Sequence, residues 1–249
     1  MSCPYIPRRT LLLGIVATAP SSALAQPAWL QKGLESLDSL DGGDRRLSQA
    51  RIGKGLKEAL RIASKQVVAR VGQAGGYLND PAIHIPLPGY LAQARDILGM
   101  AGAAGLLSDL ETQINRAAET AAPKARQLFF DAIGTMTLAD ARKILQGPDD
   151  AATQYFKRTM SPELRETFRP IMDRRLAETG ALRTLDRTLA RYSKVPFAPE
   201  LGQNAQRRLV DHGLDGALAG LFHYMAKEEA AIRNDPARRT SELLKDVFG

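Results

Sequence analysis

Residues 51–72 read RIGKGLKEALRIASKQVVARVG. The apolar side chains of this stretch recur every three or four residues, a spacing that places them on one face of an α-helix. Gly72 is suited to end the helix, because glycine readily adopts the backbone conformation that follows a helix C-terminus. The stretch therefore predicts an amphipathic helix that packs against other helices by one face. That face consists of Ile52, Leu56, Leu60, Ala63, Val67 and Val71.

Helix signals continue along the rest of the chain. Capping boxes, in which a hydroxyl side chain and an acid three residues later each bond the other's backbone, occur at 108–111 and 137–140. Ser161 before Pro162 predicts the start of a new helix, and Pro170 predicts a kink within it. Helices are expected at about 89–98, 108–122, 123–136 and 137–147, from 149 and again from 161, and at about 181–195, 200–234 and 240–248.

The longest segment without a helical pattern follows the first helix. Gly75 to Pro81 is typical of a turn, and three prolines hold Ala82–Leu87 extended, because proline fixes φ and disfavours helix in the residue before it. No longer strand-like alternation occurs in the sequence. The predicted fold is therefore all-α, a multi-helix bundle with one extended Pro-rich loop segment. The expected anchors of this loop on the helices are Leu78, Ile83 and Ile85.

Residues 1–25 have the three-part pattern of a cleaved signal peptide. Arg8 and Arg9 precede an apolar run from Leu11 to Ala19, and Ala23-Leu24-Ala25 closes the segment. Cleavage is expected before Gln26. The run is shorter than the roughly 20 apolar residues of a membrane span, so no transmembrane segment is expected in the mature chain. Twin-arginine export and export of the unfolded chain both remain open.

The mature chain is expected to have two parts. Residues 26–44 are rich in Gly, Ser and Asp and predict a flexible lead-in, followed by a single helical domain at 45–249. Cys3 is the only cysteine, so its removal would exclude disulfides, thiolate metal sites and cysteine nucleophiles. The expected location is periplasmic or secreted. That location disfavours nucleic acid as a partner, although the sequence pI is about 9.7.

Several segments carry a resemblance to a known family. Residues 77–88 read YLNDPAIHIPLP, and residues 149–156 read DDAATQYF. These segments resemble a bacterial exported family, domain of unknown function 4197. The resemblance continues at Leu214-Asp215-Gly216 and in a tail that runs from Glu228-Glu229 through Asp235-Pro236 to Val247-Phe248-Gly249. The resemblance spans nearly the whole mature chain. It implies an envelope location and supplies no activity, cofactor or catalytic residue.

Positive charge is concentrated in the first predicted helix. Residues 45–71 hold eight Lys and Arg side chains and a single acid, Glu58, whereas the whole chain has a formal net charge of +7. Lys54, Arg61 and Lys65 fall away from the apolar face of this helix. Such a basic face could bind an anionic envelope lipid or polymer, or another envelope protein. The alternative is a charged face that is simply solvated.

A polar cluster surrounds the expected helix start near residue 149. Asp149 and Asp150 precede Gln154, Tyr155 and Arg158, which follow in the first turns. Paired acids beside an amide and a guanidinium could perform acid–base chemistry or bind a polar ligand. The structural alternative is that acids at a helix start complement the helix dipole. The known catalytic signatures are missing from the sequence.

For two further sets of polar residues, a functional site and a structural role are both open. The candidates in the loop are Tyr77, Asn79, Asp80 and His84. The candidates on the expected helix at 108–122 are Asn115, Arg116 and Glu119.

The histidines are not expected to hold a metal. His212 and His223 share a helix face but lie about 16 Å apart along the axis, too far to bind one ion. His84 could approach them only through tertiary folding. No metal site and no cofactor are therefore expected.

Three function classes remain after these exclusions. The preferred hypothesis is a non-enzymatic periplasmic binding protein for an anionic envelope component, acting through the basic helix or the loop. The alternatives are a hydrolase-like enzyme that uses Asp149 and Asp150, and a helical carrier of an apolar ligand, because helix bundles can enclose such pockets.

Overall fold

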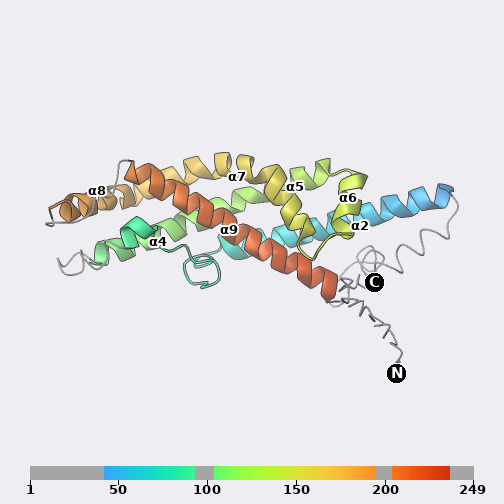
Figure 1. Cartoon of the computed structure of the whole chain (residues 1–249), viewed down its shortest axis with the longest axis horizontal. Helices are drawn as coiled ribbons and strands as arrows, with labels where there is room; N and C mark the ends of the chain where they lie inside the picture. Colours follow the sequence, from blue (N-terminus) through green and yellow to red (C-terminus); the bar gives the residue numbers. More distant parts are fainter. Residues whose placement is uncertain (1–41, 93–103, 195–203, 236–249) are drawn as a thin grey trace, which may run out of the picture.

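The computed structural model describes residues 42–92, 104–194 and 204–235. These ranges contain helices and no strand, which confirms the predicted all-α bundle (Figure 1). The signal peptide, the lead-in up to residue 41 and the expected helix at 240–248 lie outside the described residues. The helices are α2 (Gly42–Gly72), α4 (Ala104–Ala121), α5 (Ala125–Thr135), α6 (Leu138–Leu145), α7 (Ala151–Glu178), α8 (Ala181–Tyr192) and α9 (Ala205–Asn234), with a 3-10 turn, η1 (Ala122–Lys124), between α4 and α5.

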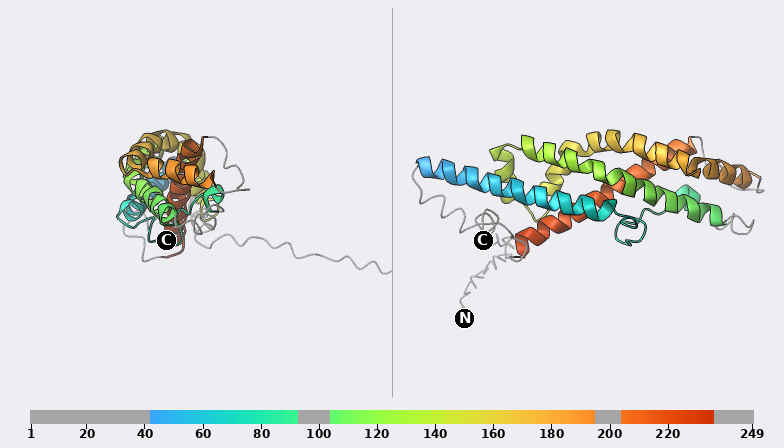
Figure 2. Two further views of the ribbon diagram at one scale, coloured as in Figure 1. Left: turned by 90° about the vertical axis from the view of Figure 1, so that its left-hand side faces the viewer. Right: turned by 180° about the vertical axis from the view of Figure 1, so that it is seen from behind.

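The helices form an elongated bundle, seen from its end and from behind in Figure 2. α9 runs obliquely across the bundle and packs against α7, α2 and α4 (Figure 1). In the core, Phe129 of α5 meets Phe156 of α7 edge to face, with ring centroids 5.1 Å apart. The ring centroid of Phe222 in α9 lies 6.5 Å from that of Phe129. Within the described ranges, no helix is both long enough and apolar enough to cross a bilayer.

Two predicted boundaries at α2 and α4 are wrong. α2 already begins at Gly42, inside the lead-in predicted for 26–44. α4 begins at Ala104, so Ser108 is an interior residue whose carbonyl accepts a hydrogen bond from Thr112 at 3.0 Å. The extra turn before Ser108 contains Leu107, which is fully buried, and this burial extends the helix past the local cap signal. At Thr137 the capping box with Asp140 is confirmed.

α7 is one continuous helix, which corrects the helix start predicted at Ser161. Pro162 and Pro170 both lie inside it. An interior proline costs about 3 kcal/mol of helix stability relative to alanine. Burial outweighs this cost, because a line of apolar side chains at every fourth position packs into the core across both prolines. The buried side chains of that line are Ala152, Phe156, Met160, Leu164, Phe168, Met172 and Leu176.

The Pro-rich loop lies against α4 and α9. Residues 81–83 belong to a turn, and residues 84–88 form neither helix nor turn, so the extended part begins later than predicted. Ile83 and Ile85 are buried and Leu78 is partly buried, which confirms the three expected anchors. The loop is therefore part of the core.

Close contact with the loop requires glycine on α9. A Cβ at Gly216 would lie 2.7 Å from the Ile85 side chain. A Cβ at Gly220 would lie 2.5 Å from the Tyr77 ring. Both distances are shorter than a real carbon contact, so the loop occupies the space that side chains would fill elsewhere on α9.

Candidate functional site

The first candidate surface is on α2. Lys54, Arg61 and Lys65, hereafter the basic face, are all exposed on the side of α2 opposite its buried residues. Among the described residues, none of the three makes an ion pair or a side-chain hydrogen bond. The neighbouring Lys57 differs, because its Nζ donates to the Gly134 carbonyl at 3.1 Å. Glu58 is half-buried between the cations, so the basic face retains a positive balance.

The loop candidate Tyr77 is held inside the protein. Its hydroxyl donates to the Ala217 carbonyl of α9 at 2.6 Å, and the ring has no exposed surface. Burial, reinforced by the Glu119 charge, raises the pKa of Tyr77 far above its usual value. A phenol with a strongly raised pKa and no contact with solvent is a structural anchor.

Asn115 and Glu119 of α4 bind the backbone of the same loop. Asn115 accepts from the Ile85 N–H at 2.9 Å and donates to the Ile85 carbonyl at 2.8 Å, as a paired strand would. One Glu119 oxygen accepts from the Tyr77 and Leu78 N–H groups at 3.2 and 3.0 Å, and the other accepts from Arg116 at 2.8 Å. The contacts of Asn115, Arg116 and Glu119 therefore support a structural role rather than a site.

Asp80 joins the loop to α2 and α9. The Tyr224 hydroxyl donates to its carboxylate, and Arg70 lies 3.4 Å from the same oxygen and 3.9 Å above the Tyr224 ring. The Tyr224 hydrogen bond is the main reason why the pKa of Asp80 falls below its usual value. Burial and the Asp80 bond raise the pKa of Tyr224.

His84 is also engaged within the protein. Its Nδ1 lies 3.0 Å from the Leu78 carbonyl, and its Nε2 lies 2.8 Å from the Glu111 carboxylate. Asn79 is the exposed member of the four loop candidates. The other three hold the loop in place, so the loop offers little polar chemistry to a partner.

We expect Glu119→Gln to lower the free energy of unfolding by about 2 kcal/mol at neutral pH, because two loop N–H groups and Arg116 lose a charged acceptor. Burial raises the pKa of Glu119, but the Leu78 N–H, Arg116 and two further N–H groups outweigh it, and the net pKa is lowered. A lowered folded pKa stabilises the fold above the unfolded pKa, and this contribution is lost as pH falls. The difference between variant and wild type should therefore shrink below about pH 4.5, the usual value for Glu.

Urea unfolding across a pH series measures this difference. Glu163→Gln, at an exposed position of α7, is the matched control and should leave stability within about 0.5 kcal/mol of wild type. A Glu119→Gln difference that stays constant on acidification would contradict the proposed role of the carboxylate.

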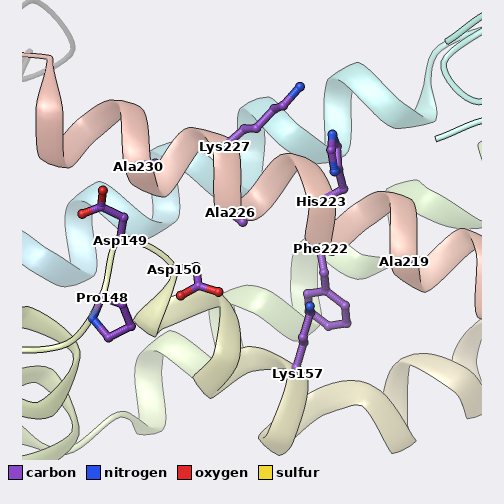
Figure 3. A pocket seen from close by; sticks show the side chains of 10 residues that line it. All are labelled: Pro148, Asp149, Asp150, Lys157, Ala219, Phe222, His223, Ala226, Lys227 and Ala230. Carbon is purple, nitrogen blue, oxygen red and sulfur yellow. The ribbon is translucent and has the colours of Figure 1, made fainter. Parts of the chain in front are cut away.

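The second candidate surface is a groove of about 720 Å³ between α9 and the start of α7 (Figure 3). Asp149 and Asp150 line it, as the sequence cluster suggested, but Tyr155 and Arg158 do not. Asp149 accepts from Asn234 at 2.9 Å, and Asp150 accepts from Gln154 at 2.9 Å. Neither carboxylate is buried. The pair therefore stays in contact with solvent and lacks the enclosed surroundings of a typical acid–base site.

The fully buried polar cluster beside this groove was missed from the sequence. Glu229 of α9 accepts from the Ala152 and Thr153 N–H groups at 2.8 Å, and so caps α7 from another helix. Arg233 donates to Glu229 and to the Ile144 carbonyl at 2.8 and 2.9 Å. The available signal was an acid on the apolar stripe of α9 followed four residues later by an arginine.

The histidines approach one another more than expected without forming a metal site. His84, His212 and His223 all line a shallow groove of about 270 Å³ beside the loop. His212 Nε2 lies 2.7 Å from the Pro86 carbonyl and so holds the loop. Within the described residues, no group of three or more His, Cys, Asp or Glu side chains could hold a metal ion.

Comparison with known proteins identifies a family. Residues 46–249 match the model of a family described as protein of unknown function, DUF4197. No curated protein and no solved structure matches the chain. Because the match covers the described bundle from α2 to α9, including the loop and both candidate surfaces, the chain belongs to the DUF4197 family.

Proposed function

We propose that the mature chain is a periplasmic or secreted binding protein for an anionic component of the cell envelope, a lipid surface or an anionic polymer. The basic face of α2 is the binding surface. One observation carries the proposal: Lys54, Arg61 and Lys65 share the exposed side of a helix whose opposite side is in the core, and none of them has an ion-pair partner in the described ranges. These charges are thus available to a ligand without breaking the fold.

The size of the effect follows from the number of charges. A Lys or Arg side chain near an anionic surface contributes about 1 kcal/mol. Three such side chains contribute about 3 kcal/mol, which corresponds to roughly 100-fold in affinity. The binding should weaken with salt, because exposed charges are screened over about 10 Å at 0.1 M ionic strength.

We expect the triple variant Lys54→Glu, Arg61→Glu, Lys65→Glu to bind anionic vesicles at least about 100-fold more weakly than wild type, with its helicity unchanged. Co-sedimentation with anionic and neutral vesicles across a salt series measures this. An anionic polysaccharide in place of vesicles separates the polymer from the lipid surface.

A second triple variant controls for net charge. Arg183, Arg187 and Arg191 are exposed on α8, and changing all three to Glu alters the net charge by the same amount. This variant should bind anionic vesicles nearly as well as wild type. If both triple variants lost the same affinity for anionic vesicles, binding would depend on net charge and not on the basic face. Equal binding of the wild type to neutral and anionic vesicles would refute the proposal.

A further inference from the structure

The groove between α7 and α9 combines an apolar floor with charges that are sorted along its length. Its floor is formed by α9, where Ala219, Ala226 and Ala230 are small and accessible and the edge of the largely buried Phe222 lies at the base. In Figure 3 the carboxylates of Asp149 and Asp150 lie toward Ala230, whereas Lys157 and His223 lie toward Ala219. The acidic end is thus the end at which α9 finishes, as the Asn234–Asp149 hydrogen bond also shows.

We propose that this groove is the docking site for residues 240–248 of the same chain, which follow α9 and would return along it in the antiparallel direction. The sequence of this segment is TSELLKDVF. Its apolar residues Leu243, Leu244, Val247 and Phe248 repeat at helical spacing, so one side of it can face the alanines and Phe222.

The groove and the segment of residues 240–248 have similar lengths. The α9 floor from Ala219 to Ala230 extends over about 16 Å, and nine residues of helix extend over about 13 Å. The connection from Asp235 to Arg239 can span up to about 17 Å. Connections of this length are usual between antiparallel helices, so the segment can reach the groove without disturbing α9.

The charges that flank the apolar residues of the segment also match the two ends of the groove. Arg238 and Arg239 follow Asp235 and come just before the segment, beside the acidic end of the groove with Asp149 and Asp150. Asp246 comes late in the segment, toward the end that holds Lys157 and His223. Glu242 and Lys245 lie between these two ends, so the match concerns the ends only. A segment that ran in the opposite direction would place Asp246 beside Asp149 and Asp150, which costs free energy.

Cysteine pairing tests this proposal, because Cys3 is the only native cysteine and Cys3→Ser removes it. In the full chain carrying Cys3→Ser, Ala226→Cys is combined with Leu244→Cys or with Phe248→Cys. At least one of the two pairs should form an intramolecular disulfide on mild oxidation, at least tenfold faster than a control pair. The control combines the same tail cysteines with Ala190→Cys, an exposed alanine of α8 at the opposite end of the bundle (Figure 1).

Charge reversal at the acidic end gives a second readout. Adding Asp149→Lys and Asp150→Lys should slow the Ala226 pairing by several-fold and leave the Ala190 pairing unchanged. Equal rates for the Ala226 and Ala190 pairs would overturn the proposal. Disulfide-linked dimers in place of monomers would also overturn it, and would assign the groove to a second copy of the chain. Circular dichroism of each variant verifies that the bundle is folded.

Discussion

Glu229→Ala should lower the free energy of unfolding by about 3–5 kcal/mol, the usual cost of removing one partner from a buried ion pair. Glu229 and Arg233 have exposed side-chain fractions of 3% and 2%, so the remaining guanidinium cannot regain its hydration. The first-turn N–H groups of Ala152 and Thr153 would also lose their acceptor. Denaturant unfolding followed by circular dichroism measures the loss.

A double variant separates the buried charge from the lost cap. Glu229→Ala combined with Arg233→Met removes the unpaired guanidinium and should recover part of the loss, because the two changes are coupled. Glu166→Ala, an exposed glutamate of α7, is the matched control and should change stability by no more than about 0.5 kcal/mol. A loss of that same small size for Glu229→Ala would show that the cluster contributes nothing net to stability.

The helices could be predicted because their signal is local. In α2, the predicted face is buried at Leu56, Leu60, Ala63, Val67 and Val71. Ile52 is only partly buried, and Ala59 and Val68 are buried without having been predicted. The errors arose where a local signal competed with burial. Ser161-Pro162 is a good helix start in isolation, but the apolar line of α7 continues through it into the core.

The polar contacts of the loop could not be assigned from the sequence, because their partners are distant along the chain. Asn115 is a polar residue on a predicted helix, yet only the folded chain brings it to Ile85. Tyr77 likewise meets Ala217 from a separation of 140 residues. The candidate cluster at Asp149 and Asp150 illustrates the same limit. Its acids line a groove, while the residue that caps α7 is Glu229, which lies 76 residues from Thr153 along the chain.

Gly220→Val should destabilise the protein by about 3 kcal/mol, at the upper end of the usual cost of overpacking a core. A Cβ at Gly220 would lie 2.5 Å from the Tyr77 ring and 3.0 Å from the Ile83 Cβ, so the loop must move away from α9. Gly134→Ala in α5 is the control: nothing lies within 4 Å of its Cβ, and it should stabilise by up to about 1 kcal/mol through helix propensity. Urea unfolding gives both values, and limited proteolysis within residues 78–86 reports loop release. Unchanged stability and unchanged cleavage in Gly220→Val would mean that the loop is not packed on α9 as described.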